Sequence, residues 1–115
     1  MSYDLAVWEG VKPADDKIAG GVYEGMMELM EKDGDVPPTP RIRAYVDALL
    51  ERWPDIDESE DSPWSMSPLI DAANGSLIYF PMVFSMAEEA SAFAAGVASD
   101  HDLVCYDPQL ERLRL

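Results

Sequence analysis

The sequence predicts an α+β domain in which helices pack on one face of a four-stranded antiparallel sheet, as in ferredoxin-like folds. Three patterns predict it: short strand-like segments near both ends of the chain, apolar residues at helical spacing between them, and a hairpin signal. The resulting order is strand, helix, helix, strand, strand, helix, strand. Since 115 residues provide one hydrophobic core, we expect residues 1–115 to form a single domain.

The first half of the chain predicts one strand and two helices. Residues 3–9 alternate in polarity before a glycine, as in a short strand. Residues 14–32 form a helix whose glycines each weaken it by about 1 kcal/mol. The apolar residues at helical spacing there are Ile18, Val22, Met26, Met27, Leu29 and Met30. The cleanest helix follows in residues 40–53, with Thr39 as N-cap and Pro40 in the first position.

The second half predicts a hairpin, a helix and a last strand. Residues 67–73 and 76–83 flank Asn74-Gly75, a dipeptide suited to a type I′ turn. Ser85 begins an S-x-x-E capping box in front of an alanine-rich helix. Residues 103–106 are an apolar run typical of a buried strand, and the tail after it predicts either a strand or a turn of helix.

Two aromatic residues fall on the face of the sheet that the predicted helices leave uncovered. If the alternate apolar residues of each strand face the helices, Trp8 and Tyr79 lie on the opposite face. That face would be partly open, and the two side chains would form a contact surface. The alternative is that the C-terminal tail or a second copy of the chain covers them.

Charge limits the classes of partner. The chain has 8 Lys and Arg against 23 Asp and Glu, a formal net charge of −15. This field repels nucleic acids and anionic membrane surfaces and steers a basic partner. A hydrophobic fraction of 48% is that of a folded protein. Because the sequence has neither a secretion signal pattern nor an apolar run long enough for a bilayer, we expect a soluble cytoplasmic protein.

The sequence contains no recognisable catalytic motif, and we expect neither an enzyme nor a cofactor. There is one His, one Cys, no G-x-S-x-G elbow and no glycine-rich phosphate loop. His101 lies between two acids at a predicted helix end, and Cys105 lies in an apolar run typical of the core. Residues 55–61 begin like a calcium loop, but Glu60 and Met66 occupy the positions of its glycine and its bidentate glutamate. We therefore expect no metal site.

The acidic loop of residues 55–61 is the candidate partner-binding site, because it contains five acids and no base. Its carboxylates would steer a partner, and flanking tryptophans would anchor it. The candidate residues are Trp53, Asp55, Asp57, Glu58, Glu60, Asp61 and Trp64, with Trp8 and Tyr79 as a second surface. The alternative is a solvated loop between two core tryptophans.

Three segments carry a family resemblance: YDLAVWEG at 3–10, LIYFPMVFSMAEEASAFAA at 77–95 and HDLVCYDPQL at 101–110. They resemble a group of small uncharacterised bacterial proteins, some of them similar to immunity proteins encoded beside polymorphic toxins of the Rhs or contact-dependent type. The shared motifs include no catalytic residues. The resemblance implies a bacterial cytoplasmic protein that binds and neutralises a cognate toxin domain.

Two functional hypotheses follow from different classes. The first is an acidic immunity-type inhibitor that occludes the active site of a basic toxin and has no catalysis of its own. The second is a small ferredoxin-like ligand-binding or regulatory domain that acts as a homodimer through its open sheet face. A monomer that forms a complex with a basic protein favours the first, and a stable homodimer favours the second.

Overall fold

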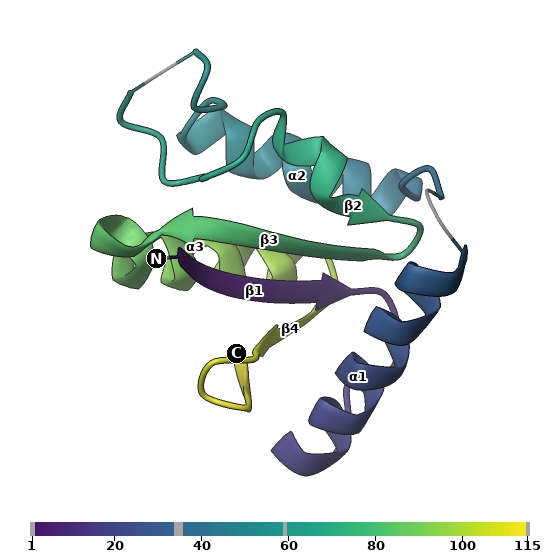
Figure 1. Ribbon diagram of the computed structural model, residues 1–115. Coiled ribbons are helices and arrows are strands. Elements are labelled where there is room, and N and C mark those ends of the chain that lie inside the picture. Colours follow the sequence, from purple (N-terminus) through teal and green to yellow (C-terminus); the bar gives the residue numbers. More distant parts are fainter. Residues whose placement is uncertain (1, 34–35, 59, 115) are drawn as a thin grey trace.

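The computed structural model describes residues 2–33, 36–58 and 60–114 (Figure 1). Within them the chain forms a five-stranded antiparallel sheet in the order β2-β3-β1-β4-β5 and three α-helices. The strands are β1 (Ser2–Trp8), β2 (Ala73–Asn74), β3 (Leu77–Val83), β4 (Val104–Asp107) and β5 (Arg112–Arg114). The helices are α1 (Asp16–Asp33), α2 (Pro40–Arg52) and α3 (Ala87–Asp100), with short 3-10 turns at Leu69–Ala72 and Phe84–Met86.

The predicted α+β class and antiparallel sheet are confirmed, but the four-stranded ferredoxin-like arrangement is not. The C-terminal tail forms β5, a fifth strand paired with β4 at the edge of the sheet. The arm of the hairpin before Gly75 contributes only the two residues of β2, because residues 69–72 form a 3-10 turn instead.

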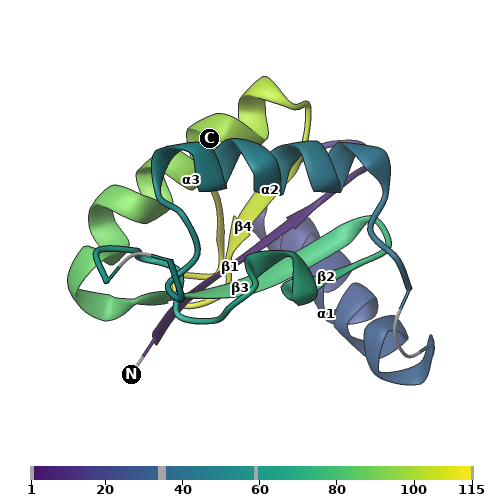
Figure 2. The ribbon, with the colours of Figure 1, turned by 90° about the horizontal axis from the view of Figure 1, so that it is seen from above.

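Helices α2 and α3 cover one face of the sheet and form the larger core (Figure 2). Thr39 starts α2 as predicted: its hydroxyl accepts a hydrogen bond from the Ile42 N–H at 3.2 Å, and Pro40 follows it. The alanines of α3 let that helix approach the sheet closely. The fully buried side chains of this core include Leu5, Val7, Ile42, Tyr45, Leu49, Trp64, Ile78 and Phe80.

Helix α1 covers the opposite face, so the prediction that every helix packs on one face is wrong. The last four residues of β1 are all buried, which requires cover on both faces of the strand. Figures 1 and 2 both show α1 apart from the pair formed by α2 and α3. The smaller core on this side contains Ala6, Trp8, Ala19, Leu77, Val104 and Tyr106, with Tyr23, Met26, Met27, Met30 and Tyr79 packed against it.

Two local predictions miss by one or two residues. Asn74 already pairs in β2, so the two-residue turn is Gly75-Ser76, and Gly75 has a φ of 59°. A glycine with positive φ in the first position is typical of a type II′ turn rather than the predicted I′ turn at Asn74-Gly75. Helix α3 begins at Ala87 after the second 3-10 turn, and its N-cap Met86 receives no side-chain cap, so the capping box at Ser85 does not form.

Candidate functional site

The acidic loop is held against the body of the protein by two of its own carboxylates. One oxygen of Asp55 accepts a hydrogen bond from the backbone N–H of Leu69 at 2.8 Å. One oxygen of Asp57 accepts a hydrogen bond from the Ser67 hydroxyl at 3.0 Å. The Glu58 N–H closes a turn on the Asp55 carbonyl at 2.8 Å. Asp55 and Asp57 therefore fix the beginning of the loop, up to Glu58.

The remaining acids of the loop point outward. Glu58, Glu60 and Asp61 are exposed. Within the part of the chain that the structure describes, neither Glu58 nor Glu60 forms a salt bridge. Of the five predicted site residues, only Asp55 is partly buried, and the other four are exposed.

The two flanking tryptophans belong to the core. Trp64 has no exposed surface, Trp53 is 8% exposed, and their rings meet edge to face with centroids 5.9 Å apart. The Trp64 indole N–H donates to the Trp53 carbonyl at 2.8 Å. The Arg52 guanidinium carbon lies 4.1 Å from the centre of the Trp53 ring. The indoles hold both ends of the loop, and Trp64 is closed to a partner in this conformation.

The second predicted surface is covered by α1. Trp8 is 1% exposed and packs against Tyr106, with ring centroids 6.1 Å apart. Tyr79 is half-buried, and its hydroxyl donates to an Asp4 oxygen at 2.9 Å. Burial, together with the Asp4 carboxylate, raises the pKa of Tyr79. Trp8 and Tyr79 therefore lie under a helix where an open contact surface was expected.

Sequence reasoning missed a buried carboxylate, Asp107, which organises the turn between β4 and β5. Its oxygens accept hydrogen bonds from the Tyr3 hydroxyl, the Gln109 backbone N–H at 3.0 Å and the Leu110 N–H at 3.1 Å. Arg114 forms a salt bridge with it at 3.6 Å. Burial alone would raise the pKa of Asp107, but these hydrogen bonds outweigh it and lower the pKa. The only sequence signal was the Asp-Pro pair that ends a strand.

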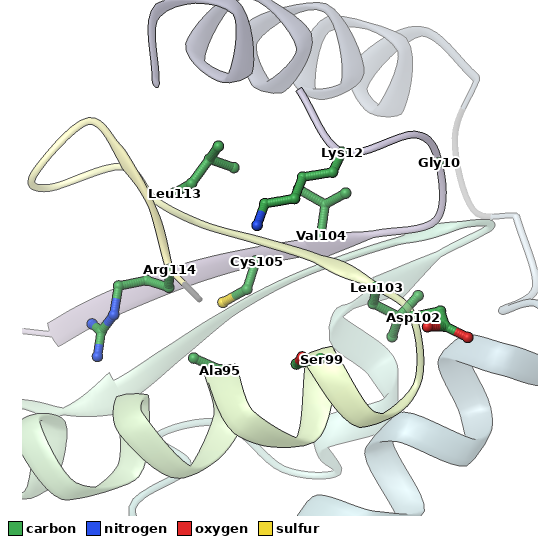
Figure 3. A pocket seen from close by; sticks show the side chains of 10 residues that line it. All are labelled: Gly10, Lys12, Ala95, Ser99, Asp102, Leu103, Val104, Cys105, Leu113 and Arg114. Carbon is green, nitrogen blue, oxygen red and sulfur yellow. The ribbon is translucent and has the colours of Figure 1, made fainter. Parts of the chain in front are cut away.

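Cys105 lies in a cavity of about 360 Å³ between α3, β4, β5 and the segment after β1 (Figure 3). In Figure 3 Lys12 enters the cavity from that segment, and Ser99 from α3. Burial raises the pKa of the Cys105 thiol to about 12, so the thiol is protonated at neutral pH. His101 is turned to its own helix, with Nδ1 2.9 Å from the Val97 carbonyl oxygen. The cavity therefore offers space and a lining that includes Lys12, Asp102 and Arg114, rather than an activated nucleophile.

Comparisons with protein-family models, with curated proteins and with solved structures give no match to this chain. Among the described residues, no helix is long and apolar enough to span a membrane, and no group of His, Cys, Asp or Glu could hold a metal ion. Residues 3–10, 77–95 and 101–110, on which the expected resemblance to immunity-type proteins rests, correspond to β1, to β3 with most of α3, and to β4. These strands are neighbours in the sheet.

Proposed function

We propose that this protein is an acidic immunity-type inhibitor, which binds a basic bacterial toxin domain and blocks its active site without catalysis of its own. The observation that carries the proposal is the arrangement of the acidic loop. Glu58, Glu60 and Asp61 are exposed, and Asp55 and Asp57 hold the beginning of the loop in place. The proposal includes a cytoplasmic location, where the inhibitor would meet its toxin before harm is done.

The physical basis is long-range attraction combined with a preformed loop. A net charge of −15 accelerates encounter with a basic protein, and a local group of exposed carboxylates orients the two molecules. Since the loop is already tied to Leu69 and Ser67, it loses little conformational entropy on binding. An inhibitor that must capture a toxin quickly needs both properties.

The test is association kinetics with the toxin domain encoded beside the gene. Neutralising the loop by Glu58→Gln, Glu60→Gln and Asp61→Asn should slow association about tenfold at low salt, with a smaller difference at high salt. The matched control removes three exposed acids elsewhere, by Asp47→Asn, Asp71→Asn and Asp100→Asn.

The two triple variants have the same net charge, so they separate the loop from the overall field. Equal slowing in both would contradict a role for the loop. A wild-type chain that neither binds this toxin domain nor restores growth of cells producing it would contradict the proposed function as a whole.

A second candidate function is a small ligand-binding or regulatory domain that acts as a homodimer. The cavity beside Cys105, with Lys12 and Ser99 in its lining, favours ligand binding. The expected dimer surface is less favourable, because α1 covers the face that contains Trp8 and Tyr79. Light scattering at low concentration tests it: a stable dimer supports this candidate, and a monomer supports the inhibitor.

A further inference from the structure

A second acidic feature lies far from the loop in the sequence, in a groove of about 530 Å³ between α1 and the turn that joins β4 to β5. We call it the Tyr106 pocket. Its polar lining comes from Asp16, Lys17 and Glu24 of α1 and from Glu111 of the turn, and Tyr23 and Tyr106 provide aromatic walls.

The hydroxyl of Tyr106 opens into this pocket without a partner. Tyr106 is 3% exposed, and its hydroxyl makes no hydrogen bond with the residues that the structure describes. Among those residues, every side-chain oxygen that is fully buried has a hydrogen-bond partner. Because the Tyr106 hydroxyl has no such partner, it is not fully buried and reaches the surface of the pocket. It lies against Gly20, where an added Cβ would be 3.1 Å from the oxygen. The absence of a side chain at Gly20 therefore leaves room for the hydroxyl.

Three carboxylates, those of Asp16, Glu24 and Glu111, line the same pocket as Tyr106. Burial raises the pKa of Tyr106, and the charges of Glu111, Glu24 and Asp16 raise it further. Asp16 also accepts a hydrogen bond from the Leu113 N–H at 2.9 Å. Glu24 and Glu111 are exposed and form no salt bridge within the described ranges. Against these three acids the pocket lining contains one cation, Lys17, so the pocket combines an excess of negative charge with aromatic surface.

We propose that the Tyr106 pocket binds an arginine side chain of the basic partner. A guanidinium is planar, so it can stack on the half-buried ring of Tyr23, which packs on Tyr106 with ring centroids 5.3 Å apart, while its N–H groups donate to the Tyr106 oxygen and to the carboxylates. Lysine fits less well because its compact ammonium cannot stack and is more strongly hydrated. This inference rests on the proposed function, which supplies the basic partner.

The outer side of α1 provides the apolar contact beside the pocket. Ile18 and Val22, two of the apolar residues that recur at helical spacing in this segment, are 50% and 38% exposed. Exposed Gly21 lies between them and has nothing within 4 Å of an added Cβ. A partner can therefore approach the helix backbone closely while its arginine enters the pocket.

The first test uses the chain alone with the capped peptide acetyl-Gly-Arg-Gly-amide, followed by NMR at the Gly20 and Gly21 amide signals. The control peptide contains citrulline, which has the same shape without the charge. The arginine peptide should bind at least about tenfold more tightly than the citrulline peptide. Equal binding of the two peptides would overturn the inference.

Variants of the chain assign the binding to named groups. Glu24→Gln with Glu111→Gln should weaken binding of the arginine peptide about fivefold, and Tyr106→Phe about threefold. The matched control Glu28→Gln with Glu31→Gln removes two acids from the same helix outside the pocket and should leave the affinity unchanged. If the control pair loses as much affinity as the pocket pair, the peptide binds through the overall charge of the chain, and the inference about the pocket is wrong.

The second test measures the affinity of the pocket variant Glu24→Gln with Glu111→Gln for the toxin domain. It distinguishes a failure of the inference about the pocket from a failure of the proposed inhibitor function. A pocket pair that loses about fivefold in affinity for the toxin, with the control pair unchanged, supports the inference. Unchanged affinity of the pocket pair overturns the inference and leaves the inhibitor function in place. A wild-type chain that binds the arginine peptide but not the toxin overturns the inhibitor function and the partner assigned to the pocket.

Discussion

The two faces of the sheet are covered in different ways. On the face under α2 and α3, large side chains such as Tyr45, Trp64 and Phe80 have no exposed surface. On the other face, a single helix that contains three glycines packs through its own half-buried tyrosine and methionines, and Leu29 on its outer side is 57% exposed. The first face therefore supplies most of the stability, and the second leaves apolar and acidic groups accessible.

This difference between the two faces matters for function, because both candidate binding features lie outside the larger core under α2 and α3. The acidic loop is tied to that core by Trp53 and Trp64 but presents its outward carboxylates beyond it. The Tyr106 pocket lies along the edge of the thinly covered face. A protein that only had to be stable would cover α1 more completely.

The largest expected effect comes from matched truncations on the two faces. Leu49→Ala on α2 should lower the free energy of unfolding by about 3 kcal/mol, because Leu49 is fully buried. Met27→Ala on α1 should lower it by only about 1 kcal/mol, because Met27 is half-buried. Urea denaturation measures both. Equal losses would mean that α1 packs as tightly as α2.

The next effect concerns Asp107, which joins the two ends of the chain. Asp107→Asn should cost about 2 kcal/mol at pH 7, because the carboxylate bonded to the Tyr3 hydroxyl is lost and Arg114 loses its salt bridge and keeps only its hydrogen bond to Ser91. The control Asp100→Asn alters an exposed acid and should change the free energy of unfolding by less than about 0.5 kcal/mol.

The stabilisation that Asp107 provides should depend on pH. The folded pKa of Asp107 is lowered, so its stabilisation is fully present above the unfolded value of about 4 and is lost as the pH falls towards the folded pKa. The wild-type chain and Asp107→Asn should therefore converge in stability in acid. A difference that stays constant from pH 7 to pH 2 would contradict the proposed charge effect.

A smaller effect, of opposite sign, tests the placement of α1. Gly21→Ala and Gly25→Ala should each raise the free energy of unfolding by about 0.8 kcal/mol, since an added Cβ has nothing within 4 Å at either position. Gly20→Ala should gain less or lose stability, because its Cβ would lie 3.1 Å from the Tyr106 oxygen. Thermal unfolding of the three variants measures the order, and equal gains would contradict the packing of α1 on Tyr106.

The smallest effect is expected on the outer side of α1. Ile18→Ser and Leu29→Ser should each change the free energy of unfolding by less than about 0.5 kcal/mol, because both side chains are at least half exposed. Denaturation at two protein concentrations checks this. A loss above about 1 kcal/mol that grows with concentration would show that a second copy covers this side.

Local signals in the sequence were sufficient for several elements. Thr39 and Pro40 define the start of α2 within one residue, and the alternating pattern of residues 3–9 matches β1 to within one residue at each end. These signals succeed because capping bonds and strand alternation involve near neighbours in the chain. The candidate loop was also recognisable, since five acids in seven residues need no fold to be visible.

Signals that depend on distant partners were ambiguous. Apolar residues recur around much of α1, so its sequence does not say which side is buried. In the structure, Ala19 and Tyr23 pack against the second face of the sheet, whereas Ile18 and Val22 are exposed. Asp57 and Glu60 look alike in the sequence, yet only Asp57 meets a hydroxyl, on Ser67.

By itself, the sequence determined the α+β class, the acidity and the positions of the main helices, because these follow from composition and from contacts between near neighbours. Only the tertiary structure decided that α1 crosses to the second face, that Trp64 closes into the core and that Asp107 is buried beneath Tyr3. Each of these outcomes depends on contacts between segments that are far apart in the sequence. A side chain is buried only when the helices and the sheet pack together and exclude water, so no single segment determines its burial.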